Sequence, residues 1–402
     1  MKKVLSGILF LVLLTGNTLH AEARRVVHSV SFDFYGDSIS IENIEAAPVG
    51  YEGSLSSEKI SDFNDSMNNA GFEPVIKALI QYKISRKPDD WLYYLLVRKT
   101  AQYFSPKAEN YDRYTLYKWY FLTHTGFDAT LSIAADKLLF YVQCDENIYD
   151  IPFHKIDGKQ YVCLNYHDYG SIDLVNTRFY KVQVSVPDAK SAFSYKLTHL
   201  PGFTAGDYKE KDLEFNYQNV NYKFRVKLNP AVKNIFANYP VADYELYFNM
   251  PMSSETYASL IPQLKENIRK MGTRQGVDYL MRFTRYAFLY QPDHDNFGKE
   301  KRLFAEQTLL YDGSDCEDRA ALFFCLVKEI YHLPMIVLAY PEHVTIAVKF
   351  DKPIGTPIIY NGQRYTICEP TPQKEDVPLG KISKSLANTA YEVAYVYEPL
   401  VK

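Results

Sequence analysis

The sequence has no long basic run and no strong excess of charge of either sign. It contains 45 lysine and arginine residues against 48 aspartate and glutamate residues, which gives a net charge of -3. A protein that binds nucleic acid neutralises phosphates with a concentrated basic surface. We therefore expect no nucleic acid partner.

Long apolar runs are also missing after the first two dozen residues. The opening stretch, "MKKVLSGILFLVLLTGNTLHAEA", has two lysines, an apolar core and small residues at Ala21 and Ala23. This is the pattern of a secretory signal peptide over residues 1–23. No later segment approaches the ~18 apolar residues of a membrane span, and no cysteine near residue 20 offers a lipid anchor. We expect a periplasmic or secreted protein without a membrane span.

Cysteine is scarce, and its count is odd. Five cysteines in 402 residues exclude a disulfide-rich scaffold and leave at least one thiol unpaired even after export. For four of them, burial as small apolar side chains is the expected role. Whether Cys144 pairs with Cys163 stays open at this stage. The five are Cys144, Cys163, Cys316, Cys325 and Cys368.

The remaining composition is that of a globular chain, and its pattern predicts an α+β protein of several domains. Helical periodicity followed by strands indicates an N-terminal α+β domain over residues 24–175. Short alternating runs divided by Pro, Gly and Asp predict a β-rich, sandwich-like module over residues 176–252. Helices and then strands return over residues 253–402.

The two α+β regions resemble each other. Residues 109–142 align without a gap with residues 315–348 and share an Asp-Arg pair, a leucine and a closing valine. Further on, "IDGKQYVCLN" matches "YNGQRYTICE", and each has Asp-Gly or Asn-Gly, the preferred chemistry of a tight hairpin turn. We infer a duplication whose first copy is degenerate and inactive, because it has different residues opposite the reactive ones. The opposed pairs are Asn110 and Cys316, Lys137 and His343, and Asn165 and Glu369.

Cys316 opens a predicted helix. Asp315 is a good N-cap, and Asp318 three residues later is close to a capping-box arrangement. Unpaired N–H groups and the helix dipole favour a thiolate there. A base held by a third group would complete a catalytic site. His343 begins one predicted strand and Glu369 ends another, so antiparallel pairing would make them neighbours.

Each of these residues also has a purely structural explanation. A cysteine at a helix start is often part of the packing, a histidine at a strand start is often a turn residue, and a glutamate before Pro-Thr is often solvated. Their order and spacing together favour a site.

The segment Gly-Ser-Asp-Cys-Glu-Asp at 313–318, the helix after it, His343 and Glu369-Pro370-Thr371 resemble the transglutaminase-like family of papain-like cysteine enzymes. The resemblance covers residues 254–375. It implies a papain-like core, with Cys316 as nucleophile, His343 as base and then acid, and Glu369 as the orienting group in place of the usual aspartate. The backbone N–H of Cys316 would stabilise the oxyanion, with the side-chain amide of Gln307, nine residues upstream, as a second candidate donor.

The resemblance implies acyl transfer through a thioester, on a peptide or protein substrate such as a cell-envelope peptide. We expect hydrolysis, because nothing in the sequence indicates a dedicated amine site. Protein-glutamine transglutaminase activity and a catalytically idle binding or scaffold protein are the alternatives. The oligomeric state stays open.

No cofactor or metal is expected. The stretch "DHDNFG" at 293–298 resembles a calcium loop, but Phe297 and Phe304 stand where oxygen ligands belong.

Overall fold

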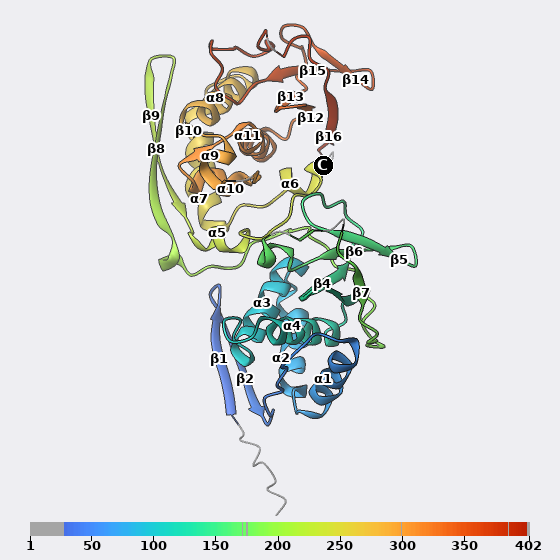
Figure 1. Cartoon of the computed structure of the whole chain (residues 1–402). Coiled ribbons are helices and arrows are strands. Elements are labelled where there is room, and N and C mark those ends of the chain that lie inside the picture. The colour runs from blue at the N-terminus through green and yellow to red at the C-terminus, as the bar shows by residue number, and fades with distance from the viewer. Residues whose placement is uncertain (1–27, 171, 174–175, 299, 385, 400–402) are drawn as a thin grey trace, which may run out of the picture.

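The structure is a computed structural model that describes residues 28–399 except 171, 174–175, 299 and 385 (Figure 1). The predicted signal peptide, residues 1–23, lies outside the described residues. Among the helices that are described, none is both long enough and apolar enough to cross a membrane. The chain forms two halves stacked end to end, each with helices and a five-stranded antiparallel sheet, so the α+β prediction is confirmed.

The first half begins with a two-stranded hairpin and continues with four helices that precede its sheet. Its strands follow the order β5-β6-β4-β3-β7. The elements are β1 (His28–Phe34), β2 (Asp37–Ile44), α1 (Ser57–Asn69), α2 (Glu73–Arg86), α3 (Asp90–Phe104), α4 (Tyr111–His124), β3 (Ala129–Ala134), β4 (Lys137–Gln143), β5 (Phe153–Ile156), β6 (Lys159–Cys163), the 3-10 helix η1 (Tyr166–Tyr169) and β7 (Phe179–Lys181).

The second half repeats this plan, and its sheet has the order β14-β15-β13-β12-β16. A 3-10 turn, η2 (Ala205–Asp207), precedes it. The elements are β8 (Lys209–Tyr217), β9 (Val220–Leu228), α5 (Ala231–Ile235), α6 (Tyr244–Phe248), α7 (Ser254–Ile268), α8 (Thr273–Tyr286), β10 (Leu289–Tyr290), α9 (Asp293–Phe297), α10 (Ala305–Leu310), β11 (Gly313–Ser314), α11 (Cys316–Tyr331), β12 (Met335–Tyr340), β13 (His343–Val348), β14 (Ile358–Tyr360), β15 (Gln363–Cys368) and β16 (Glu392–Tyr397).

The two sheets agree in strand order and also in register. Ala134 pairs with Lys137 in the first sheet, and Tyr340 pairs with His343 in the second, both 206 positions later. The tight turns between β5 and β6 and between β14 and β15 have positive φ at both central residues, which suits Asp-Gly and Asn-Gly. Those φ angles are 51° and 81° at Asp157 and Gly158, and 45° and 72° at Asn361 and Gly362.

The helix starts require a correction to the gap-free alignment. Asn110 is the N-cap of α4 and accepts from the backbone N–H of Arg113, as Asp315 is the N-cap of α11. The residue at the position of Cys316 is therefore Tyr111, not Asn110. The gap-free alignment is wrong by one residue at this point because α4 and α11 differ in length. Sequence identity this low could not reveal that difference.

The β-rich, sandwich-like module predicted over residues 176–252 is absent from the described residues. Its first strand, β7, joins the sheet of the first half, and β8 and β9 form an isolated long hairpin. One face of that hairpin packs on α7 and α8, as Figure 1 shows. Burial does alternate along β8 and β9. A hairpin that packs one face on helices has the same two-residue period as a strand of a sandwich, so the pattern could not distinguish them.

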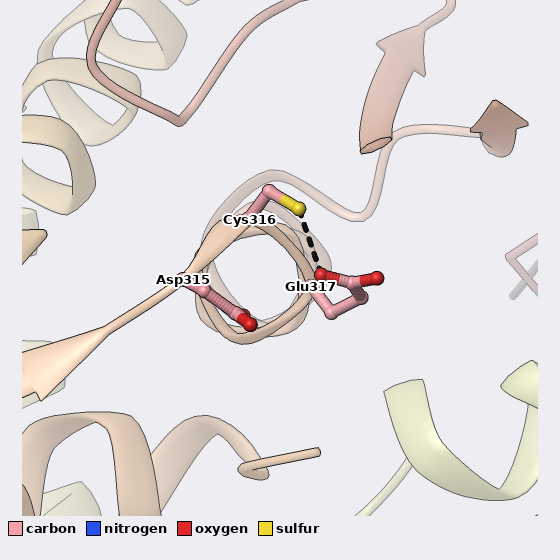
Figure 2. Close-up of side chains that lie close together, drawn as sticks. All are labelled: Asp315, Cys316 and Glu317. Carbon is pink, nitrogen blue, oxygen red and sulfur yellow. Dashed lines mark hydrogen bonds between the residues drawn. The ribbon is translucent and has the colours of Figure 1, made fainter. Parts of the chain in front are cut away.

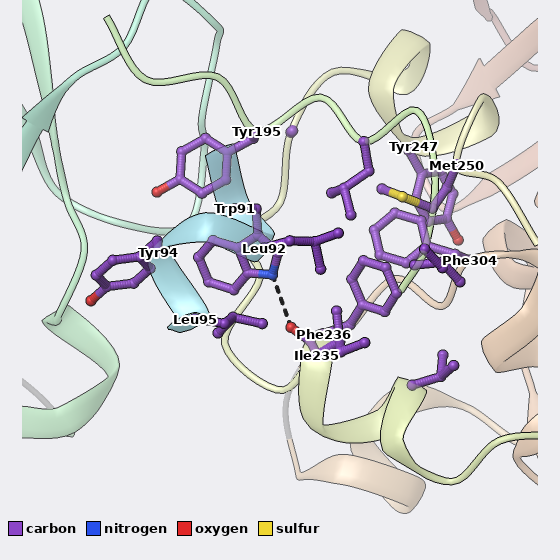
Figure 3. Packing of buried hydrophobic residues seen from close by; sticks show 14 of the residues in the cluster. Trp91, Leu92, Tyr94, Leu95, Tyr195, Ile235, Phe236, Tyr247, Met250 and Phe304 are labelled. Carbon is purple, nitrogen blue, oxygen red and sulfur yellow. Dashed lines mark hydrogen bonds between the residues drawn. The ribbon is translucent and has the colours of Figure 1, made fainter. Parts of the chain in front are cut away.

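A cluster of aromatic side chains joins the two halves (Figure 3). Trp91 of α3 is 1% exposed, and its indole N–H donates to the carbonyl of Ile235 in α5 at 2.9 Å. Its ring packs against Tyr195 and Tyr239. The only tryptophan of α3 therefore fixes the first half to the second by both packing and a directed hydrogen bond.

We predict that Trp91→Phe lowers the unfolding free energy by about 1–3 kcal/mol, because it removes buried volume and leaves the Ile235 carbonyl unpaired. It should also separate the unfolding of the two halves in calorimetry. The matched control is Trp119→Phe in α4, whose indole N–H donates to the carbonyl of Ala129 in the same half. That variant should lose stability without separating the transitions, and equal behaviour of the two variants would contradict the role of Trp91.

Candidate active site

Cys316 is the first residue of α11, as predicted. The Asp315 side chain accepts from the backbone N–H of Asp318, and the Asp318 side chain accepts in return from the N–H of Asp315. The Asp318 carboxylate is fully buried and also accepts from the N–H of Leu303 at 2.7 Å. This reciprocal capping box holds the helix start rigidly, so the place of the thiol is well defined.

The environment of the thiol differs from the expected one. Figure 2 shows the Cys316 and Glu317 side chains pointing toward each other, and the thiol donates to the Glu317 carboxylate at 2.7 Å. Burial, together with the charge and hydrogen bond of Glu317 and the charge of Asp315, raises the pKa of Cys316. The helix start alone would favour a thiolate, but these neighbours outweigh it, so the resting group is a protonated thiol.

His343 and Glu369 are hydrogen-bonded as predicted. His343 begins β13 and Glu369 directly follows β15, which pairs antiparallel with β13. The His343 Nε2 and Glu369 Oε2 atoms are 2.8 Å apart. Burial opposes the charged imidazole, but the hydrogen bond and charge of Glu369 prevail and raise the pKa of His343. Because Nε2 is engaged, Nδ1 is the nitrogen left to exchange a proton.

The Glu369 carboxylate is held on its second oxygen as well. Its Oε1 accepts from the backbone N–H of Thr371 at 2.9 Å. Pro370 cannot extend the strand ladder, so the chain turns there and brings that N–H back to the side chain. The side chain of Glu369 is 1% exposed. The Glu-Pro-Thr motif therefore fixes the position of the carboxylate that bonds His343.

The helix that starts with the thiol packs against the strand that starts with the histidine. The backbone N–H of Val344, the residue after His343, stabilises the charge of the Cys316 sulfur. Among the described residues, no hydrogen bond joins the thiol to the imidazole. The three predicted residues thus converge on the first residues of β13, with the sulfur turned toward Glu317.

Gln307, the predicted second oxyanion donor, does not lie on a loop. It is fully buried within α10, where its Oε1 accepts from the backbone N–H of Phe304 at 3.2 Å. Its amide Nε2 is buried and has no partner within the described part of the chain. Among the described residues no hydrogen bond joins it to Cys316, so its role at the oxyanion stays a prediction.

Acidic side chains crowd this end of α11. Asp293, Glu300 and Asp315 place carboxylate oxygens within 4.8 Å of one another, close enough to share a cation, and so do Asp315 and Glu317 with the thiol. Burial and mutual repulsion raise the pKa of Asp315 to about 8 and that of Asp293 to about 7. The segment that was rejected as a calcium loop therefore contributes charge to the site through Asp293.

Sequence reasoning missed the residues that restrain and support the site. Glu317 was visible only as the neighbour of Cys316. Arg319 and Arg285 are almost fully buried and donate to backbone carbonyls around the site. An arginine on an apolar helix face, as Arg285 is in "LMRFTRYAF", was the available signal.

All five cysteines are free and buried, which answers the question left open for Cys144 and Cys163. Burial raises the pKa of both these thiols to about 12. Cys325, on the same helix as Cys316, is part of the main hydrophobic cluster, as predicted.

We predict that Asp293→Asn stabilises the protein increasingly as the pH rises. Asp293 binds its proton with a pKa of about 7 when folded and about 3.9 when unfolded, so stability falls as pH rises between these values. The asparagine removes that penalty and keeps an acceptor for the N–H of Lys301. The melting temperature should rise by about 2–4 °C at pH 8 and by less at pH 5. An equal change at both pH values would contradict the titration of Asp293.

Comparison of the chain with protein-family models, with curated proteins and with solved structures finds no match in any of the three. The functional argument therefore depends on the geometry of the site.

Proposed function

We propose that the protein is an exported, thiol-dependent amide hydrolase of transglutaminase-like type with a papain-like core. Cys316 is its nucleophile, His343 its base and acid, and Glu369 its orienting group. One observation supports this more than any other: the 2.8 Å bond between His343 and Glu369 at the ends of two adjacent strands, beside a capped helix that starts with the cysteine. A peptide or protein segment is the substrate.

The first half-reaction forms an acyl-enzyme. Nδ1 of His343 takes the thiol proton, and the sulfur of Cys316 attacks the amide carbonyl carbon. The resulting oxyanion lies near the helix start, where the N–H of Cys316 is unpaired. The C–N bond then breaks, and the departing amine takes the proton from the imidazolium, which Glu369 stabilises throughout.

Water resolves the thioester in the second half-reaction. His343 removes a proton from water, hydroxide adds to the acyl carbon, and the C–S bond breaks to release a carboxylic acid and the thiol. We favour water as acceptor because the Cys316 side chain is buried beside the carboxylates of Glu317 and Asp315, and the sequence indicates no dedicated amine site.

The first copy supports the assignment by contrast. Its Tyr111, at the position of Cys316, donates to Asp168 and accepts from the amide of Asn165, which stands in the place of Glu369. Lys137, in the place of His343, pairs with Asp136 at the surface. These groups make a satisfied structural network with no nucleophile and base, so we assign catalysis to the second copy alone.

We predict that His343→Ala slows the alkylation of Cys316 by iodoacetamide about tenfold between pH 7 and 9, because the thiol loses its base. In the wild type the rate should rise with pH through the raised pKa of His343, since the imidazolium must first lose its proton. Peptide mapping measures labelling at Cys316 specifically. His199→Ala, a half-exposed histidine of the first half, is the control and should not change the rate.

We predict that Glu317→Gln speeds the alkylation of Cys316 about tenfold at pH 7. The substitution removes the charge that raises the thiol pKa, and one pKa unit corresponds to a tenfold change in thiolate. Glu329→Gln, on the same helix and away from the thiol, is the matched control. If His343→Ala has no effect on labelling in either the wild-type or the Glu317→Gln background, Cys316 and His343 do not act together and the proposed function fails.

A further inference from the structure

The first half contains a pocket of about 670 Å³ on the face of its sheet that is turned away from the helices. Tyr141, His154 and Ile156 form its floor, and Phe153, Phe179 and Lys181 lie at its rim. Its volume is in the range of ligand-binding pockets. Phe153 is 52% exposed and Phe179 is 41% exposed, so two aromatic side chains of the pocket are open to a ligand.

The duplication identifies the same face in the second half. By the shared register, Tyr141 corresponds to Ala347 and Lys181 to Val393. The hairpin register likewise pairs His154 with Ile358. Ser132 corresponds in the same way to Leu338, and Ile156 to Tyr360. All five second-half residues belong to one apolar cluster or pack against it: Leu338, Ala347, Ile358, Tyr360 and Val393.

That cluster is covered by its own chain. Ile382 and Leu386, from the connection between β15 and β16, pack onto it. The connection between β6 and β7 in the first half is shorter. Its Tyr166, Tyr169 and Ile172 pack against the cluster that contains Tyr141, and Tyr166 also lines the pocket, which stays open beside them. The longer connection of the second half thus brings two aliphatic side chains onto the face that contains the pocket in the first half.

The pocket has also acquired charge. Lys181 stands where the covered copy has a valine, and among the described residues no carboxylate pairs with its ammonium group. Burial and the charge of Lys181 both lower the pKa of the adjacent His154. Ser132 and His154 are also polar where the second half has aliphatic side chains, so the pocket combines polar groups with aromatic ones.

We propose that the pocket binds, from another polypeptide, a segment with aliphatic side chains beside a carboxylate. The aliphatic groups take the place that Ile382 and Leu386 occupy in the second half, and the carboxylate pairs with Lys181. This binding goes beyond the proposed amide hydrolysis and does not depend on Cys316.

The test measures fluorescence anisotropy of a fluorescein-labelled peptide with two leucines four positions apart and flanking aspartates. The full chain should bind this peptide and not its serine-for-leucine version. Lys181→Glu should weaken binding about tenfold and improve binding of a lysine-flanked version. Phe179→Ser should weaken binding as well. Cys316→Ala should bind as the wild type does, which separates this proposal from the proposed function.

Two matched controls guard against effects on folding. Tyr180→Ser changes an exposed aromatic residue on the same strand that does not line the pocket, and Lys196→Glu changes an exposed lysine outside it. Neither should alter binding. The proposal is overturned if the leucine peptide does not bind, if Lys181→Glu and Phe179→Ser act no more than their controls, or if an oligosaccharide such as cellohexaose binds the rim in place of the peptide.

Discussion

Two buried arginines form the constraint on which the site depends. Arg319 of α11 donates to the carbonyls of Thr284 and Arg285 in α8 at 3.0 and 2.9 Å. Arg285 in turn donates through Nε to the backbone carbonyl of Glu369 at 3.2 Å. A guanidinium is costly to bury without partners, so these carbonyls cannot move away without a large penalty. The helix that starts with Cys316 is thereby tied, through α8, to the residue that orients the base.

This coupling explains how the site tolerates so much negative charge. Asp293, Asp315, Asp318 and Glu317 surround one helix start, and their mutual repulsion would by itself pull that segment apart. The helix N-terminus and Arg319 supply compensating positive charge, and raised pKa values leave Asp293 and Asp315 partly protonated near neutral pH. At Cys316, the proposed nucleophile, burial and the charge of Glu317 raise the pKa and keep the thiol protonated. Under the proposed function, Cys316 reacts when an entering substrate displaces or neutralises Glu317.

Sequence reasoning succeeded where the physical signal was local. The N-cap pattern placed Cys316 at the helix start, and strand ends placed His343 beside Glu369. It failed where the same sequence pattern is compatible with several tertiary structures. The two-residue period of the β8 and β9 hairpin, for example, suited a sandwich equally well. It also failed where the decisive contact is made by a neighbouring side chain: no spacing rule indicates that the Glu317 carboxylate turns toward the thiol.

The duplication shows how one fold can divide two tasks between its copies. The second copy covers the outer face of its sheet with its own chain, and its proposed catalytic groups lie where α11 packs on β13. In the first copy, the helix start is closed by a satisfied network around Tyr111, and it is the outer face that is open. The anchor at Trp91 holds the two halves together, so a polypeptide held at the Lys181 pocket stays tethered to the half that contains Cys316. Such tethering would raise the effective concentration of substrate at a thiol that is intrinsically slow.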